Sequence, residues 1–493
     1  MDHRAGAGRG WGQVSRVKDV LELLAARREA SLEELVEFAS IPSVSAQPAH
    51  APDMARAAEW LSERLRRCGP MKVELWPTAG HSAVYAEWLG APGAPTLLVY
   101  GHYDVQPPEP LEKWHTPPFL PTVREGREGR GGPDGEKRVY GRGVSDDKGP
   151  LLIAVQTADA YFSATGALPI NLKFLLEGEE EQGSPHLEPL VKAQAKRLEA
   201  DFVLSADGGM WSADLPSLTV SARGLAALEF TVRGPSKDLH SGRHGGAVQN
   251  PLHALAALIA SLHTVEGRVA VDGFYDGVTE HTPLEREAVR QLPFREADYL
   301  AQTGAPEVFG EPGFSTLERQ WDRPTVEVNG FWGGYVGEGS KTVLPSEAQA
   351  KLTCRLVKGQ DPARVVGLLE VHLRRHLPPG VTLELRPSAH GCAAYRLSED
   401  HPGKVVALEV MREVYGQVPL EVGMGGSIPV LDIFKRILGL ETVLLSFAVG
   451  DEDIHAPNEF FRVHRLLEGG RAWALYWARL AERSLAERGV ARG

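Results

Sequence analysis

Between residues 72 and 207 of this 493-residue chain, short apolar segments alternate with longer segments of helical periodicity. The segments "TLLVYG" (96–101), "INLKFLLEG" (170–178) and "DFVLSAD" (201–207) have the length and apolar content of buried strands. Between the first two lies "GPLLIAVQTADAYF" (149–162), which is typical of a helix. Strands that alternate with helices form sheets with parallel members. The alternation therefore predicts an α/β fold.

The pattern changes after about residue 217. Strand-like segments such as "LTVSARGLAALEFTVRG" (218–234), expected to form a long strand pair, accompany a helix that starts at Pro251 with Asn250 as its N-cap. The α/β pattern returns with "HPGKVVALEVMREVYG" (401–416). A chain of this length favours two domains. We therefore expect a main α/β domain formed by residues 1–217 and 397–493, interrupted by an inserted α+β domain at 218–396.

Charge and cysteine content limit the classes of partner and the compartment. The net charge of -12 argues against nucleic acid or an anionic membrane as the main partner, and no apolar run is long enough to span a bilayer. The N-terminus lacks the apolar core of a signal peptide. The widely spaced Cys68, Cys354 and Cys392 are expected to be ordinary buried thiols. Such thiols suit a reducing compartment, so we expect a cytoplasmic protein.

Polar residues follow the predicted strands, where sites form in open α/β sheets. His102 and Asp104 come directly after the first strand, and their two-residue spacing points both side chains the same way. This suits a ligand imidazole with a carboxylate partner, although a hydrogen bond at the loop end would explain it equally well. Asp146 and Asp147 follow "VYGRGVS" and could alternatively cap the next helix.

Further acids and a histidine follow other segments. Glu179, Glu180 and Glu181 form an acidic run in "LLEGEEEQGSP" (175–185), and such runs usually face solvent. Asp207 follows "FVLSA", and His455 lies in "DEDIHAPNE" (451–459), where a lone histidine is more often a surface residue. Together the five segments supply the oxygen and nitrogen ligands of a two-metal hydrolytic site, with zinc or manganese most natural. Such a site needs a bridging carboxylate.

Several motifs carry a family resemblance. The segments "GHYDVQP", "GRGVSDDKGP", "EGEEEQGSP", "DLHSG" and "IHAPNE" resemble the signature segments of the carnosinase and cytosolic non-specific dipeptidase group. That group belongs to the two-metal peptidase family that includes glutamate carboxypeptidase, succinyl-diaminopimelate desuccinylase and acetylornithine deacetylase. The resemblance spans about residues 20 to 485. It implies an exopeptidase catalytic domain, with a mixed, largely parallel sheet flanked by helices, and an inserted lid and dimerisation domain.

The resemblance also implies a set of ligands for two divalent metal ions, zinc first and manganese or cobalt as alternatives. His102 and Asp207 would bind one ion, Glu181 and His455 the other, and Asp146 would bridge them.

Other residues acquire catalytic roles through the same resemblance. Glu180 would be the general base, and the register of the motif leaves Glu179 as the expendable acid. Asp104 would orient His102. His240 of "DLHSG" would reach the active site of a second subunit as an oxyanion donor, although a histidine that caps a turn is the simpler interpretation.

The implied substrate is a dipeptide, bound by a homodimer. Arg355 would clamp the terminal carboxylate of the peptide, a task suited to a guanidinium, although an arginine on a strand is usually a surface residue. Thr342, His390 and Ser427 are further candidates for substrate contact. The alternatives are an N-acyl amino acid amidohydrolase and a non-catalytic peptide-binding relative. The glycine-rich segment 124–138 is expected to be a solvated loop that could modify access to the site.

Overall fold

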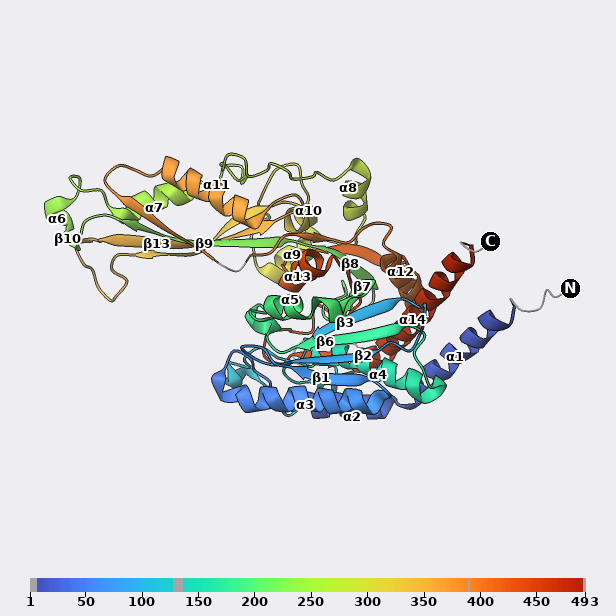
Figure 1. Ribbon diagram of the computed structural model, residues 1–493. Helices are drawn as coiled ribbons and strands as arrows, with labels where there is room; N and C mark the ends of the chain where they lie inside the picture. Colours follow the sequence, from blue (N-terminus) through green and yellow to red (C-terminus); the bar gives the residue numbers. More distant parts are fainter. Residues whose placement is uncertain (1–6, 127–135, 389–390, 491–493) are drawn as a thin grey trace. The chain divides into compact units, whose positions relative to one another are not determined.

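The computed structural model describes residues 7–126, 136–388 and 391–490, and it divides into two compact units (Figure 1). The first unit comprises Met1–Val220, Leu397–Val422 and Ile433–Gly493. The second unit comprises Ser221–Arg396 and Gly423–Asp432. Among the described residues, no helix is long and apolar enough to cross a membrane.

A mixed sheet forms the centre of the first unit. Its strands follow the order β1-β2-β6-β3-β7-β17-β8 within a nine-stranded sheet. β3 is parallel to β6 and β7, and β17 is parallel to β7, whereas β1, β2 and β8 pair antiparallel with their neighbours. The strands are β1 (Lys72–Trp76), β2 (Ala83–Trp88), β3 (Thr96–His102), β6 (Asn171–Glu177), β7 (Phe202–Ser205), β8 (Ser217–Ala222) and β17 (Thr442–Leu444). The α/β class is confirmed, and the four adjacent strands β6, β3, β7 and β17 pair in parallel.

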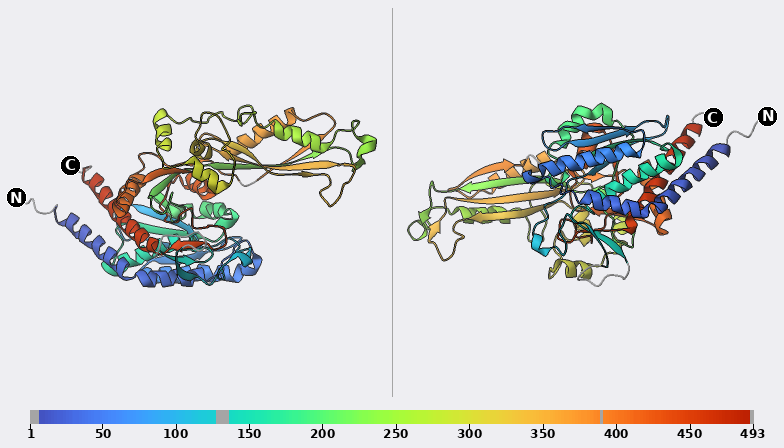
Figure 2. Two further views of the ribbon diagram at one scale, coloured as in Figure 1. Left: turned by 180° about the vertical axis from the view of Figure 1, so that it is seen from behind. Right: turned by 90° about the horizontal axis from the view of Figure 1, so that it is seen from below.

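Helices enclose this sheet. They are α1 (Ala7–Ala26), α2 (Arg28–Ala39), α3 (Ala51–Cys68), α4 (Lys148–Thr165), α5 (Leu187–Leu198), α12 (Pro402–Tyr415) and α14 (His464–Val490). α1, α4 and α14 pack against one another (Figure 2). Every residue of β6 is buried, as expected for a strand covered on both faces.

In the segment "SLEELVEFAS" (31–40) the sequence predicts a helix that begins after Ser31 as its N-cap, and this prediction is wrong. The spacing of Ser31 and Glu34 has the form of a capping box, yet Ser31 lies inside α2, whose N-cap is Arg27. The N–H of Ser31 donates to the carbonyl of Arg27, and the N–H of Arg27 donates to the carbonyl of Leu23 at the end of α1. Because the chain continues from one helix almost directly into the next, no helix terminus exists at Ser31 for its side chain to cap.

Smaller elements complete both units. The first unit also contains a three-stranded sheet of β4 (Thr122–Glu125), β5 (Lys137–Tyr140) and β18 (Phe460–Arg462). The segment 124–138, expected to be a loop, begins and ends within strands, because residues 124–125 belong to β4 and residues 137–138 to β5; most of the segment lies outside the described residues. Further elements are β10 (Leu239–His240), α6 (Ser241–His244), α8 (Pro283–Arg290), α9 (Glu296–Thr303), α10 (Thr316–Trp321), β12 (Val343–Leu344), β15 (Tyr395–Arg396), β16 (Leu420–Met424) and α13 (Pro429–Ile433).

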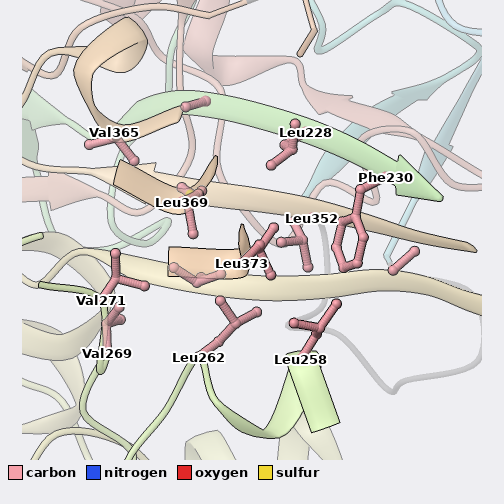
Figure 3. Packing of buried hydrophobic residues seen from close by; sticks show 14 of the residues in the cluster. Leu228, Phe230, Leu258, Leu262, Val269, Val271, Leu352, Val365, Leu369 and Leu373 are labelled. Carbon is pink, nitrogen blue, oxygen red and sulfur yellow. The ribbon is translucent and has the colours of Figure 1, made fainter. Parts of the chain in front are cut away.

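The second unit is built on a four-stranded antiparallel sheet in the order β11-β13-β9-β14. Its strands are β9 (Gly224–Arg233), β11 (Thr325–Gly333), β13 (Glu347–Leu356) and β14 (Thr382–Pro387), and the helices α7 (Pro251–Ala260) and α11 (Pro362–Arg375) pack against it. Leu228, Phe230 and Leu352 of the sheet meet Leu258 and Leu369 of the helices in the core (Figure 3). Because strand side chains alternate between faces, residues such as Arg355 lie on the opposite face.

The two strands expected to pair at 218–234 belong to different sheets. β8 joins the nine-stranded sheet and β9 the four-stranded sheet. Gly224, where β9 begins, approaches another segment closely: a Cβ there would lie 2.5 Å from the carbonyl oxygen of Cys392 and 2.7 Å from the nitrogen of Ala394. Only glycine fits this contact without a shift of the backbone. The helix start predicted at Pro251 is confirmed, because the side chain of Asn250 accepts the N–H of Leu252 at 2.9 Å.

Candidate metal centre

The carboxyl ends of three neighbouring strands supply the first part of the candidate site. His102 is the last residue of β3, the glutamate run follows β6, and Asp207 follows β7. Since β3 is parallel to both β6 and β7, these ends meet at one edge of the sheet. The strand order thus explains why residues about 100 positions apart come together.

Two groups of possible metal ligands lie at this edge. His102, Asp146 and Asp207 have ligand atoms within 4.8 Å of one another, and so do Asp146, Glu181 and His455. Nε2 of His102 lies 3.0 Å from Oδ1 of Asp146, while Nε2 of His455 lies 3.0 Å from Oδ2 of Asp146 and 3.2 Å from Oε2 of Glu181. Asp146 therefore contributes one carboxylate oxygen to each group. The five residues expected as ligands lie together.

The chemistry of these donors fits two divalent cations. Burial, and then the charge of Asp146, raise the pKa of Asp207 to about 6. Hydrogen bonds to Asp146 and Glu181 raise the pKa of His455 to about 10. Oε1 of Glu181 is buried and has no hydrogen-bond partner in the part of the chain that the structure describes. Imidazole nitrogens and carboxylate oxygens are natural ligands of zinc and manganese, and cations would compensate the crowded carboxylates.

Asp104 holds several of the possible ligands and their neighbours in place through hydrogen bonds. It accepts the backbone N–H groups of Glu180 (3.2 Å) and Glu181 (3.1 Å) and the hydroxyl of Ser45 (2.6 Å). Nδ1 of His102 lies 3.1 Å from the backbone carbonyl of Asp104 and 3.4 Å from its side chain. A proton on Nδ1 leaves Nε2 as the ligand atom. Asp104 thus orients both the imidazole and the glutamate run, and the second contact was not expected from the sequence.

The three glutamates of the acidic run have different surroundings. Glu179 is buried, and its carboxylate lies 2.9 Å from Nδ1 of His186. Glu181 belongs to the second ligand group and also accepts a hydrogen bond from the side-chain amide of Gln106 at 2.7 Å. Glu180 belongs to neither group, and burial together with nearby carboxylates raises its pKa well above the ordinary value. The run is therefore not a solvated patch.

Asp147 is not a member of either ligand group. It occupies the N-cap position of α4 but makes no side-chain capping bond there. Its carboxylate instead accepts the backbone N–H of His102 at 3.2 Å, and the Asp146–Asp147 peptide is cis. Asp147 therefore holds the end of β3 rather than capping the helix.

Glu459 is a site residue that was not predicted from the sequence. Its buried carboxylate accepts the backbone N–H groups of Gly143 (2.8 Å), Ser145 (2.9 Å) and Asp146 (3.2 Å), and it pairs with buried Arg142 at 2.9 Å. It thereby fixes the backbone that carries the shared ligand Asp146. Glu459 is the last residue of the motif "IHAPNE", four residues after His455, and this position could have marked it as a candidate. Nothing in the motif indicates the direction of its side chain.

The expected substrate-binding residues of the second unit form two pairs. His240 of β10 lies next to the segment of Thr342, and Nδ1 of His240 accepts the N–H of Gly242 at 3.1 Å. This is the turn-capping interaction, in an exposed residue. Arg355 donates to the hydroxyl of Ser427 at 2.9 Å. His390 lies outside the described residues.

Comparison with known proteins decides the family. The model of "Peptidase family M20/M25/M40" matches residues 98–479. The chain belongs to this peptidase family. Its match covers the strand ends and ligand groups described above, from the last residues of β3 to α14.

Relatives within the M20/M25/M40 family match over nearly their whole length. The Cys-Gly metallodipeptidase dug1 of Schizosaccharomyces pombe is 31% identical, with 93% of this chain and 97% of that protein covered. The human Beta-Ala-His dipeptidase is 27% identical, with 94% and 93% covered. The crystal structure of the M20 family metallo-carboxypeptidase Sso-CP2 from Sulfolobus solfataricus has a TM-score of 0.79 at 31% identity, covering 92% of this chain and 99% of that one.

Proposed function

We propose that this chain is a dipeptidase that hydrolyses the peptide bond of dipeptides with two divalent metal ions, zinc being the expected native ion. The observation that carries the proposal is Asp146, whose two carboxylate oxygens face two different imidazoles, those of His102 and His455. A carboxylate in this position is what a two-metal site requires as a bridge. The relationship to metallodipeptidases over nearly the full chain supports the choice of substrate.

The roles of the residues follow from this arrangement. His102 and Asp207 would hold one ion, Glu181 and His455 the other, and Asp146 both. When bound, the ions polarise the scissile carbonyl and lower the pKa of water. Glu180, directly before a ligand and with its backbone held by Asp104, accepts the proton of the attacking water on its carboxylate and donates it to the leaving amine.

The second unit would bind the ends of the substrate. The guanidinium of Arg355 offers a planar pair of donors that suits a terminal carboxylate, and Ser427 already accepts one of its hydrogen bonds. Thr342 and His390 would contact the peptide. His240, exposed on the short strand β10, would donate to the oxyanion in the site of a partner subunit.

A homodimer formed through the second unit is supported by its sheet. Among the described residues, β11 pairs with β13 alone, so its other edge offers unpaired backbone groups. Val328 (39%), Phe331 (47%) and Trp332 (39%) are exposed on this strand. Exposed edges with apolar side chains are usually covered by a partner. Three buried cysteines without disulfides suit the cytoplasm as the compartment.

Substrate choice is tested with a mixed panel. The metal-stripped protein is reloaded with zinc, manganese or cobalt and incubated with dipeptides, tripeptides and N-acetyl or N-succinyl amino acids, followed by mass spectrometry. We expect metal-dependent loss of the dipeptides. Equal or faster loss of the acylated amino acids would instead make the chain an N-acyl amino acid amidohydrolase. Peptide binding without any product would make it a binding protein.

A further inference from the structure

The segment Gly423–Ser427 of the second unit is held by one arginine that has no role in the proposed chemistry. Nε of Arg223 donates to the carbonyl of Gly425 at 2.9 Å. Nη1 of the same side chain lies 3.3 Å from the carbonyl of Arg323 and 3.5 Å from that of Arg319. The backbone N–H of Arg223 is also shared between the carbonyls of Met424 (3.2 Å) and Gly426 (3.1 Å). A single residue thus ties this segment to the region of α10.

Arg223 forms no direct ion pair with a described carboxylate, although the charges of Glu327 and Asp322 favour its charged form. Among the described residues, no carboxylate oxygen lies within 4 Å of its guanidinium nitrogens. Burial, and then the charge of Arg355, lower its pKa to about 10. A partly buried charge bound only to carbonyls is costly, so its presence calls for a reason beyond packing. The planar fork of a guanidinium can reach carbonyls of several segments at once, which an ammonium group cannot do with the same geometry.

The same segment also packs closely against α10. A Cβ at Gly423 would lie 2.7 Å from the ring of Trp321. A Cβ at Gly425 would lie 3.0 Å from the carbonyl of Gln320 and 3.4 Å from Nη2 of Arg223. A side chain at Gly423 would require the Trp321 ring to move, and one at Gly425 would push against the carbonyl of Gln320 and the guanidinium of Arg223.

The confined segment ends at the partner of the expected carboxylate clamp. Ser427 lies two residues beyond Gly425, and its hydroxyl accepts from Nη1 of Arg355 at 2.9 Å. Arg223 and Arg355 also line one cavity of about 600 Å³ within the second unit. A chain of contacts thus runs from Arg223 through the segment and Ser427 to the guanidinium of Arg355.

We propose that Arg223 is a positioning residue of the carboxylate-binding subsite: it fixes Gly423–Ser427 so that Ser427 aligns Arg355 with the free C-terminal carboxylate of a peptide substrate. The inference rests on the proposed function, since it takes Arg355 as the carboxylate ligand. Arg223 is expected to govern the affinity for the carboxylate and not the rate of bond cleavage.

The test compares a dipeptide with its C-terminal amide, using metal-loaded full-length protein. We expect Arg223→Lys to raise KM for the free acid by about tenfold with little change in kcat, because an interaction present in both ground state and transition state is weakened. Kinetics with the amide, which lacks the carboxylate, should hardly change. Gly425→Ala disturbs the segment without altering any charge and should have the same effect. The control Arg233→Met removes an exposed arginine at the other end of β9. It should change KM and kcat for neither the free acid nor the amide.

Amide hydrogen exchange provides a readout that does not depend on activity. In Arg223→Lys, exchange at 423–427 should accelerate while β13 remains protected. Unchanged exchange there, or equal KM increases for acid and amide, would overturn the positioning role. A wild-type protein that hydrolyses no dipeptide would contradict the proposed function instead, and hydrogen exchange alone would then decide whether Arg223 fixes the segment.

Discussion

The carboxylate of Glu459 accepts the backbone N–H of Asp146 at 3.2 Å, although 313 positions separate the two residues. Glu459 also accepts the N–H groups of Gly143 and Ser145, so the loop before Asp146 converges on one buried carboxylate. Because Asp146 offers an oxygen to each ligand group, the position of Glu459 determines the geometry of both groups.

Replacement of Glu459 by glutamine should therefore damage both stability and metal binding. The amide loses one acceptor oxygen and leaves buried Arg142 without a counter-charge, which should lower the free energy of unfolding by about 3–5 kcal/mol. Urea denaturation measures the stability, and titration with a metal indicator measures the affinity. The control Glu409→Gln removes an exposed ion pair with Arg483 and should cost less than about 1 kcal/mol. Equal effects of the two changes would refute the anchoring role.

Asp104→Asn should weaken metal binding without unfolding the protein. The amide cannot accept all the hydrogen bonds that Asp104 receives from Ser45, Glu180 and Glu181. Loss of such a supporting group typically costs about 10–100-fold in metal affinity or activity. Asp53→Asn, at the start of α3 and bonded to His50, serves as the control. Wild-type affinity in Asp104→Asn would show that the imidazole and the glutamates are held by other contacts.

Dimer formation through the edge of β11 can be tested by measuring the mass of the protein in solution. Trp332→Glu places a charge on the exposed edge strand and should convert a dimer into monomers, as measured by sedimentation velocity. Val418→Glu makes a comparable change at an exposed apolar residue of the first unit and should leave the mass unchanged. If His240 serves the partner's site, mixed dimers of His240→Ala and Glu180→Gln should recover activity that neither variant has alone. A monomeric wild-type protein would exclude this arrangement.

Protonation of His372 should destabilise the second unit in acid. Burial, and then the nearby His376, lower the pKa of His372, whose Nε2 contacts Ser261. Because the folded state favours neutral histidine, its stabilisation is complete above the unfolded pKa of about 6.5 and is lost as pH falls from there through the folded pKa. His372→Gln cannot titrate at this position. The stability of the wild type relative to this variant should therefore decrease between pH 8 and pH 5; a constant difference would exclude the effect.

Local patterns in the sequence predicted the α/β class and the gathering of polar residues at one edge of the sheet, whereas the assignment of the metal ligands rests on the family resemblance and stays a prediction. His102 and Asp207 could be located because residues after parallel strands share one edge of a sheet, and a family resemblance supplied their roles. Glu459 and Arg223 were missed because their partners lie far away in the chain, where no periodicity reports a contact. The prediction at Ser31 failed for a local reason, because α1 continues almost directly into α2 and leaves no helix terminus at Ser31.

The most direct test of the central claim compares Glu180→Gln with Glu179→Gln in metal content and dipeptide hydrolysis. The proposed mechanism predicts two metal ions per chain in both variants. Glu180→Gln should lose several orders of magnitude in kcat, because it cannot accept the proton of water. Among the described residues the carboxylate of Glu179 bonds to His186 alone, so Glu179→Gln should keep kcat within about tenfold of the wild type. Full activity in Glu180→Gln, or its loss in Glu179→Gln alone, would contradict the assignment of Glu180 as the general base.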